Sequence, residues 1–197
     1  MPPFIYLASQ SPRRSQLLTQ LGMEHELLLA TAEEDAEALE QHIPGESPLD
    51  YVQRVTRLKL NAAIMRLQAR GLPTAPVLCA DTTVALGNTI YAKPVDAEDA
   101  VRMLQGLSGQ THVVYTAVAI GTADRCEQAC SASEVTFAAM SDAEIRAYVA
   151  SGEPMGKAGA YAVQGLAAAF IVRIAGSYTG IMGLPLYETA QLLKRFG

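Results

Sequence analysis

The sequence predicts a mixed α/β fold with a partly antiparallel sheet and flanking helices. Short apolar runs that are typical of strands alternate with amphipathic segments of helical period along the chain. Some runs are joined by hairpin signals and others need helical crossovers, a combination that builds a mixed sheet. With 197 residues, half of them hydrophobic, the chain is long enough for one well-buried domain over residues 1–197.

The first predicted unit is a strand, a loop and a helix. The apolar run at residues 4–8 is typical of a buried strand. Ser11 fits an N-cap, whose hydroxyl satisfies an orphan N–H group, and Pro12 fits the first helical position because it has no N–H. Gly22 ends this helix.

A second helix is predicted over residues 47–70. Apolar side chains recur there at helical spacing, which predicts a buried stripe with Lys59 at its edge. The stripe consists of Tyr51, Val55, Leu58, Ala62 and Met65.

The run "PVLCADTTVAL" predicts a buried strand that ends at Asp81, followed by a second extended segment. Gly87 and Asn88 then suit a hairpin turn. The later elements alternate in the same way. They are a helix from its N-cap Asp96 to Gly106, a strand over 111–122, a helix over 141–152 with a capping box of Ser141 and Glu144, a strand over 167–176 and a helix over 184–196.

Composition narrows the possible partners. A net charge of −5 and a pI near 5.2 exclude broad electrostatic binding to nucleic acid, which requires clustered Lys and Arg. The N-terminal stretch lacks the pattern of a signal peptide, and no run of about 18 apolar residues occurs. We therefore expect a soluble cytoplasmic protein with no membrane or nucleic-acid partner.

The first helical turn carries two arginines, which the positive end of the helix dipole disfavours. A strand that leads into a helix N-terminus presents free N–H groups, so this segment is suited to bind phosphate. Hydroxyl and guanidinium donors would come from Ser9, Ser11, Arg13 and Arg14. The alternative is that both arginines are solvated and that Ser11 only caps the helix.

Asp81 directly follows an apolar run. A carboxylate there must be paired, hydrogen-bonded or metal-bound, because burying it alone is costly. A divalent cation would satisfy it, and capping of the following turn is the alternative. Mg²⁺ takes one or two carboxylates with water and substrate phosphates. Further ligand candidates are Glu33, Glu34 and Asp35, in an acidic run that as a whole is typical of a solvated loop or helix start.

Four more side chains are candidates for nucleotide contacts. Lys59 and Lys93 are single cations that could reach phosphate, although each is also typical of a surface lysine with a buried stem. The glycine-rich segment 152–165 predicts a loop, in which Lys157 could contact phosphate and Gln164 could read a base edge. An ordinary connection is the alternative for this loop.

Five ordered blocks cover nearly the whole chain: "LASQSPRRSQLL", "ADTTVALGNTIYAKP", "LSGQTHVVYTAVAI", "GKAGAYAVQG" and "GSYTGIMGLPLYET". They resemble the signature blocks of the Maf family of nucleoside triphosphate pyrophosphatases. The resemblance implies two lobes around a central cleft, a divalent cation such as Mg²⁺ or Mn²⁺, and a homodimer. It also implies hydrolysis of a nucleoside triphosphate to the monophosphate and pyrophosphate.

Carried over to this chain, the resemblance makes Asp81 the general base that activates water, and Glu34 and Asp81 the metal ligands. The triphosphate contacts that it implies are Ser9, Arg14, Lys59 and Lys93. The branch that acts on dTTP and UTP, rather than on 7-methyl-GTP, is marked by Arg13, Thr82 and Gln164. We therefore expect a preference for these two pyrimidine nucleotides.

One position departs from the family pattern. Gly156 stands where the family commonly has an aspartate before Lys-Ala-Gly, so a carboxylate is missing from the expected pocket. There are two alternatives: Glu153 supplies the missing carboxylate, or it does not. Our hypothesis is that Asp81 and Glu34 suffice.

Two other functions remain as alternatives. The chain could be a nucleotide-sensing regulator of cell division or septum formation, which an unchanged phenotype in an Asp81→Asn strain would favour. It could also be a pyrophosphatase for modified or non-standard nucleotides, which comparative kcat/KM values would separate from dTTP and UTP hydrolysis.

Overall fold

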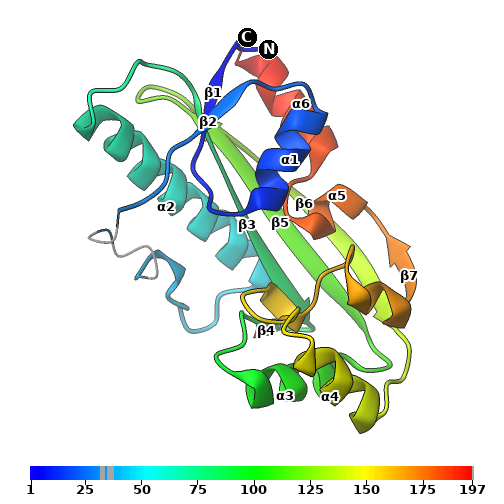
Figure 1. Ribbon diagram of the computed structural model, residues 1–197. Helices are drawn as coiled ribbons and strands as arrows, with labels where there is room; N and C mark the ends of the chain where they lie inside the picture. Colours follow the sequence, from blue (N-terminus) through cyan, green and yellow to red (C-terminus); the bar gives the residue numbers. More distant parts are fainter. Residues whose placement is uncertain (32–33, 35–37, 197) are drawn as a thin grey trace.

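The computed structural model describes residues 1–31, 34 and 38–196 (Figure 1). Across these residues a seven-stranded mixed sheet has the strand order β2-β1-β3-β5-β6-β7, with β4 paired to β3. The strands are β1 (Ile5–Leu7), β2 (His25–Leu27), β3 (Val77–Leu86), β4 (Thr89–Tyr91), β5 (Thr111–Gly121), β6 (Cys126–Phe137) and β7 (Ile171–Ala175). β1 is parallel to β2 and β3, and the other pairs are antiparallel. The predicted mixed α/β class is confirmed.

Helices cover both faces of this sheet (Figure 1). α2 packs on one face against β3 and β5, and α1 and α6 pack on the opposite face. α3 and α4 belong to a separate core cluster at the other end of the long strands, so the elements form two lobes. The α-helices are α1 (Pro12–Gln20), α2 (Pro48–Ala69), α3 (Ala97–Leu107), α4 (Asp142–Ala150), α5 (Tyr178–Met182) and α6 (Leu186–Arg195), and the 3₁₀ helices are η1 (Ala38–Glu40), η2 (Ala158–Ala160) and η3 (Leu166–Phe170).

Strand β3 changes partner along one of its edges. β1 pairs with Val77 and Leu78, and β4 pairs with residues 84–86, whereas β5 follows the other edge from Val77 to Ala85. The stretch 79–83 therefore has no strand partner on the first edge within the described part of the chain. Neighbouring side chains of a strand point to opposite faces. The side chains of Asp81 and Thr82 therefore lie on opposite faces of the sheet, at an edge where no neighbouring strand of the described chain covers them.

Local sequence signals predicted many of these elements correctly. The helix starts at Ser47 and Asp96 are confirmed, since each side chain accepts a hydrogen bond from the backbone N–H three residues later. The capping box of Ser141 and Glu144 is present at α4. The hairpin at residues 87–88 joins β3 to β4. In the described chain, no helix is long and apolar enough to cross a bilayer.

Four local predictions were wrong. The strand predicted over residues 167–176 begins only at Ile171, because the preceding residues form the 3₁₀ helix η3. Asp81 lies in the middle of β3, not at a strand end, because β5 pairs with the strand without interruption. Leu58 and Met65 of the predicted stripe are exposed, at 36% and 68%, because the buried face of α2 is rotated toward residues such as Val52 and Leu60. Ser11 occupies the N-cap of α1, but its hydroxyl makes no capping hydrogen bond.

Candidate active site

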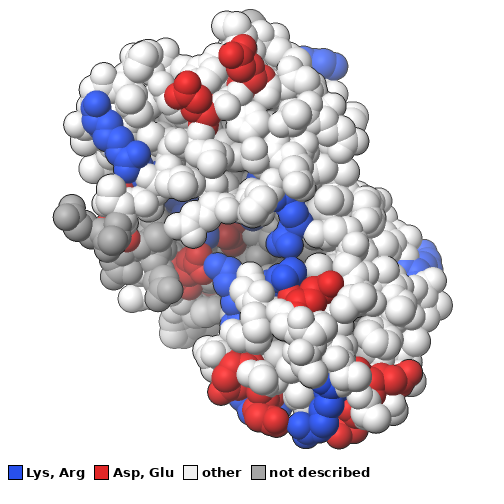
Figure 2. Space-filling view, in the orientation of Figure 1, with Lys and Arg blue, Asp and Glu red and all other residues white. Residues whose placement is uncertain are grey.

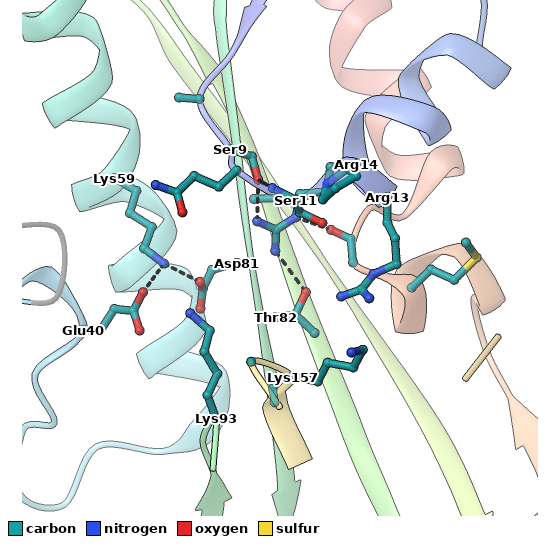
Figure 3. A pocket seen from close by; sticks show the side chains of 18 of the residues that line it. Ser9, Ser11, Arg13, Arg14, Glu40, Lys59, Asp81, Thr82, Lys93 and Lys157 are labelled. Atoms are coloured by element: carbon teal, nitrogen blue, oxygen red, sulfur yellow. Dashed lines mark hydrogen bonds and ion pairs between the residues drawn. The ribbon is translucent and has the colours of Figure 1, made fainter. Parts of the chain in front are cut away.

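A cleft of about 600 Å³ opens beside the unpaired edge of β3 (Figure 3). The loop after β1 and the first turn of α1 form one wall, and α2 with the end of η1 forms another. The segment 156–163 and the end of α5 close the remaining side. Elements from both lobes thus contribute to one cavity.

The lining of this cleft is strongly cationic, although the whole chain has a net charge of −5. Lys and Arg side chains gather in the hollow of the surface (Figure 2). Such a local excess of positive charge suits a polyanionic ligand. The charged lining residues are Arg13, Arg14, Lys59, Arg66, Lys93 and Lys157, with the two carboxylates Glu40 and Asp81.

Lys59 bridges the two carboxylates of the cleft (Figure 3). Its Nζ lies 2.6 Å from Asp81 Oδ1 and 2.7 Å from Glu40 Oε1. All three side chains are largely buried, with 22% of Lys59, 15% of Asp81 and 35% of Glu40 exposed. Burial alone would lower the pKa of Lys59, but the two carboxylates outweigh it and the pKa is raised. Burial would raise the pKa of Glu40, but Lys59, together with Lys93 and Arg14, outweighs it and the pKa is lowered.

Arg14 reaches the same edge of β3 from the opposite wall. Its guanidinium donates to Gly183 O at 2.8 Å, Ser9 Oγ at 3.1 Å and Thr82 Oγ1 at 3.3 Å. All three acceptors are neutral, and burial lowers the pKa of Arg14 despite the attraction of Asp81. A cation desolvated in this way, without a directly bonded carboxylate among the described residues, would be stabilised by an anionic ligand.

Arg13 and Lys157 are a second pair of cations in the lining. Burial and then the charge of Arg13 lower the pKa of Lys157. Lys157 Nζ donates to the backbone oxygen of Glu153, and neither cation has an ion-pair partner in the described chain. Lys93 likewise lines the cleft and makes no ion pair in the described chain, although its charge helps to lower the pKa of Glu40 (Figure 3). These three cations can therefore bind the negative charge of a ligand in the cleft.

A local hydrogen bond lies within the loop between β1 and α1. Ser11 N donates to Ser9 Oγ at 3.2 Å, and Pro12 has no N–H to satisfy. The Ser11 hydroxyl, which makes no capping bond, therefore lies in the cleft wall as a potential donor. The predicted association of Ser9, Ser11 and both arginines with one site agrees with this placement.

Glu34 does not join the group around Asp81. Its carboxylate accepts from Arg66 Nη2 at 2.6 Å and from Nε at 2.8 and 2.9 Å, and these bonds lower the pKa of Glu34 to about 2. Arg66 also donates to Leu28 O at 3.0 Å, so the pair fastens the chain after β2 onto α2. The other two predicted ligands of the acidic run, Glu33 and Asp35, lie outside the described residues.

Glu40 is the acidic side chain that sequence reasoning missed. It follows the predicted candidates by only a few positions, and nothing in the local pattern distinguishes it from other glutamates of the run. Tyr51 Oη donates to its backbone oxygen at 3.0 Å and Lys59 binds its carboxylate. These long-range contacts with α2 bring Glu40 to the cleft.

The model of the Maf-like protein family matches residues 4–196. The chain belongs to the Maf family. It is 67% identical over 197 residues to a dTTP/UTP pyrophosphatase of Albidiferax ferrireducens, which covers 100% of this chain and 98% of that relative. A dTTP/UTP pyrophosphatase of Cupriavidus metallidurans is 61% identical over 197 residues, with the same two shares. Among solved structures, the Staphylococcus aureus Ham1 protein matches with a TM-score of 0.45 and 12% identity over 68% of this chain and 72% of that chain.

The late loop of this Maf family member holds the remaining predicted residues. Lys157 lines the cleft, whereas Gln164 is exposed and outside the lining, next to the lining residue Val163. Gly156 lines the cleft, and a Cβ there would meet no atom within 4 Å. The Glu153 carboxylate is engaged elsewhere, because it accepts from Tyr148 Oη at 2.8 Å and from Leu166 N at 2.9 Å. Glu153 therefore does not replace the carboxylate missing at Gly156.

The residues present fit a divalent cation. Asp81 and Glu40 both bind the same Nζ atom, so the two carboxylates already share one cationic group. Two carboxylates are a typical protein contribution to a Mg²⁺ site that substrate phosphates and water complete. No cluster of three or more acidic, His or Cys side chains suited to a metal occurs among the described residues. The ion would accordingly depend on the substrate for much of its coordination.

Proposed function

We propose that the cleft hydrolyses dTTP and UTP to the nucleoside monophosphate and pyrophosphate. The observation that carries this proposal is the position of Asp81, which lies with Glu40 in a cleft lined by six Lys and Arg side chains. A nucleoside triphosphate supplies negative charge to the four of these cations that have no ion-pair partner in the described chain, Arg13, Arg14, Lys93 and Lys157. The names of the full-length relatives, dTTP/UTP pyrophosphatase, support the choice of substrates.

The triphosphate lies between the two walls of the cleft. Ser9 and Arg14 bind it from the β1–α1 side, and Lys59 and Lys93 bind it from the other. Breaking the α–β anhydride places extra negative charge on the departing pyrophosphate, and fixed cations stabilise that charge in the transition state. The hydrogen bonds that hold Arg14 support this role, because they orient the guanidinium before the substrate arrives.

Asp81 acts as the general base. It accepts the proton of a water molecule that attacks the α-phosphorus in line with the leaving pyrophosphate. Lys59 holds the carboxylate by its 2.6 Å contact and balances its charge. The carboxylate therefore has a directly bonded cation in its partly buried position.

Asp81 and Glu40 would hold a divalent cation, Mg²⁺ or Mn²⁺. Glu40 takes the role that the sequence assigned to Glu34, whose carboxylate Arg66 occupies. When bound, the ion neutralises phosphate charge and lowers the pKa of coordinated water. The carboxylates' contribution is to fix its position beside β3.

Selection of the base rests with Arg13, Thr82 and Gln164. Arg13 and Thr82 lie in or at the cleft, and an apolar wall beside them includes Val114 and Tyr161. A flat pyrimidine fits such a wall, while polar side chains at its rim can read the carbonyl groups of uracil and thymine. Gln164 would have to turn inward to take part, since it is exposed.

Three further properties belong to the proposal. The protein is located in the cytoplasm, it forms a homodimer, and it binds no nucleic acid. Its nucleotide substrates and its family support the first two points, and its net charge of −5 supports the third. Sedimentation equilibrium measures the oligomeric state directly. A monomer at micromolar concentration would contradict the dimer.

Pyrophosphate release from a panel of nucleoside triphosphates tests the proposed function. The panel contains dTTP, UTP, dCTP, dGTP, 7-methyl-GTP and non-standard nucleotides, each with Mg²⁺ or Mn²⁺. We expect dTTP and UTP to be turned over selectively and the Asp81→Asn variant to be inactive. Binding without turnover of any nucleotide would instead favour a nucleotide sensor.

A further inference from the structure

Two of the sequence blocks that characterise this chain meet in its interior at His112 and Tyr161. His112 is 1% exposed and Tyr161 is 6% exposed. His112 Nε2 lies 2.8 Å from Tyr161 Oη. The ring of Phe137 packs edge-on against both, with centroid distances of 5.1 Å to His112 and 4.9 Å to Tyr161. Tyr161 thus has one buried polar partner and one aromatic neighbour that fix its ring.

Tyr161 connects this buried pair to the cleft. It lines the cavity, together with Val114, which is two residues from His112 on β5. Side chains two apart on a strand point to the same face. His112 therefore lies on the same face of β5 as Val114, beside Tyr161 and outside the cleft lining.

Tyr161 also ends a segment with unusual backbone geometry. Gly156, Gly159 and Ala160 have φ values of +72°, +68° and +58°, and Ala160 is the one non-glycine residue with positive φ in the described chain. A side chain at Gly159 would come within 3.0 Å of Val84, so η2 packs tightly on β3. Strained backbone of this kind persists where its surroundings fix it. Tyr161 is the buried anchor that directly follows.

The imidazole is poorly explained as a purely structural core residue. His112 Nδ1 is buried and has no partner in the described chain. A buried polar atom without a partner is destabilising, and an aromatic hydrocarbon side chain of similar size would avoid it. The retained polar contact is the one to Tyr161 Oη. The contribution of His112 is therefore the position in which its hydrogen bond holds the Tyr161 side chain.

We propose that His112 is a positioning residue for substrate binding, which acts through Tyr161. It fixes the Tyr161 ring in the cleft wall and thereby fixes the segment 156–161, which carries Lys157 into the cleft. The consequence for nucleotide binding rests on the proposed function. Because His112 touches neither Asp81 nor the cations around it, its loss affects KM and leaves kcat nearly unchanged.

Three variants and a control test this inference. His112→Phe removes the hydrogen bond and keeps an aromatic ring, Tyr161→Phe removes only the hydroxyl, and His112→Gln restores a polar group that can reach Tyr161. Ile120→Val is the matched control, since Ile120 is a fully buried residue of the same strand in a separate core cluster. The two readouts are amide hydrogen exchange of residues 156–161 and steady-state kinetics with dTTP.

We expect His112→Phe and Tyr161→Phe to speed exchange of residues 156–161 and to raise KM for dTTP about fivefold each, the effect of one neutral hydrogen bond. His112→Gln and Ile120→Val should resemble the wild type in both readouts. Unchanged exchange in Tyr161→Phe, or an equal rise of KM in Ile120→Val, would overturn the inference. If the wild type hydrolyses no nucleotide, the proposed function fails, and the exchange data still decide whether His112 positions the segment.

Discussion

Lys59 Nζ lies 2.6 Å from Asp81 Oδ1, so an ammonium group on α2 is bonded to a carboxylate in the middle of β3. The same nitrogen binds Glu40 at 2.7 Å. The contact joins two residues that are 22 positions apart in sequence, and it holds the Asp81 carboxylate against α2. It also explains how a carboxylate is tolerated inside a central strand.

Replacing Lys59 by methionine tests the importance of this contact. The change leaves two largely buried carboxylates without their shared cation, so we expect unfolding free energy to fall by about 2 kcal/mol and kcat/KM for dTTP to fall about 100-fold. Urea unfolding and steady-state kinetics measure the two effects. Lys194→Met, an exposed change on α6, is the control. Full activity of Lys59→Met would show that Lys59 has no role in substrate binding or catalysis.

The structure separates two glutamates as candidate metal ligands. Glu40→Gln should weaken Mn²⁺ binding in the presence of a non-hydrolysable dTTP analogue about tenfold or more, because it removes one of two carboxylate ligands. Glu34→Gln should leave Mn²⁺ binding unchanged and slightly lower the thermal midpoint, because Arg66 loses its ionised partner. Electron paramagnetic resonance of Mn²⁺ measures the binding. Weaker Mn²⁺ binding in Glu34→Gln, with unchanged binding in Glu40→Gln, would identify Glu34 as the metal ligand.

Gly156→Asp restores the carboxylate common in the family. A Cβ at Gly156 meets nothing within 4 Å, but the φ of +72° costs about 1 kcal/mol for a side chain. We expect kcat to change less than about threefold, since Asp81 and Glu40 already supply the carboxylates of the cleft. Gly152→Asp, with a φ of +75° and no lining role, controls for backbone strain. A large gain in kcat in Gly156→Asp alone would show that the natural chain lacks a catalytic carboxylate.

His112 should make stability depend on pH in mildly acidic solution. Burial lowers its pKa to about 4 from an ordinary value of 6.5. Above pH 6.5 the ring is neutral in both folded and unfolded chains. As pH falls from 6.5 to 4, the unfolded chain binds a proton that the folded chain does not, so unfolding free energy decreases by about 3 kcal/mol.

Urea unfolding of the wild type and His112→Gln between pH 7.5 and pH 4 measures this contribution as the difference between their pH slopes. Carboxylates titrate in both proteins and cancel in the comparison. We expect the steeper loss in the wild type. Parallel curves would mean that His112 keeps an ordinary affinity for protons.

Local chemistry in the sequence predicted much of the fold. The N-caps Asp96 and Ser141, the start of a helix at Ser47 and the hairpin at residues 87–88 depend on neighbouring residues, so the local sequence is enough to predict them. β6 gave no such signal. Two of its buried positions hold the polar residues Ser131 and Ser133, so the alternation of apolar and polar residues that predicts a strand is interrupted.

The sequence predicted the cationic residues of the candidate site better than its carboxylates. Ser9 and Arg14 lie at a strand-to-helix junction, a local pattern that predicts a phosphate site. The choice between Glu34 and Glu40 depends on which residue of α2 each one meets after folding. That information lies in the packing of distant segments, and the acidic run alone does not contain it.

The most direct measurement is hydrolysis of dTTP in ¹⁸O-labelled water, followed by mass spectrometry of both products. If Asp81 directs water to the α-phosphorus, the label enters dTMP, the pyrophosphate stays unlabelled, and Asp81→Asn gives neither product. Label in the pyrophosphate, or formation of dTDP and phosphate, would contradict the account.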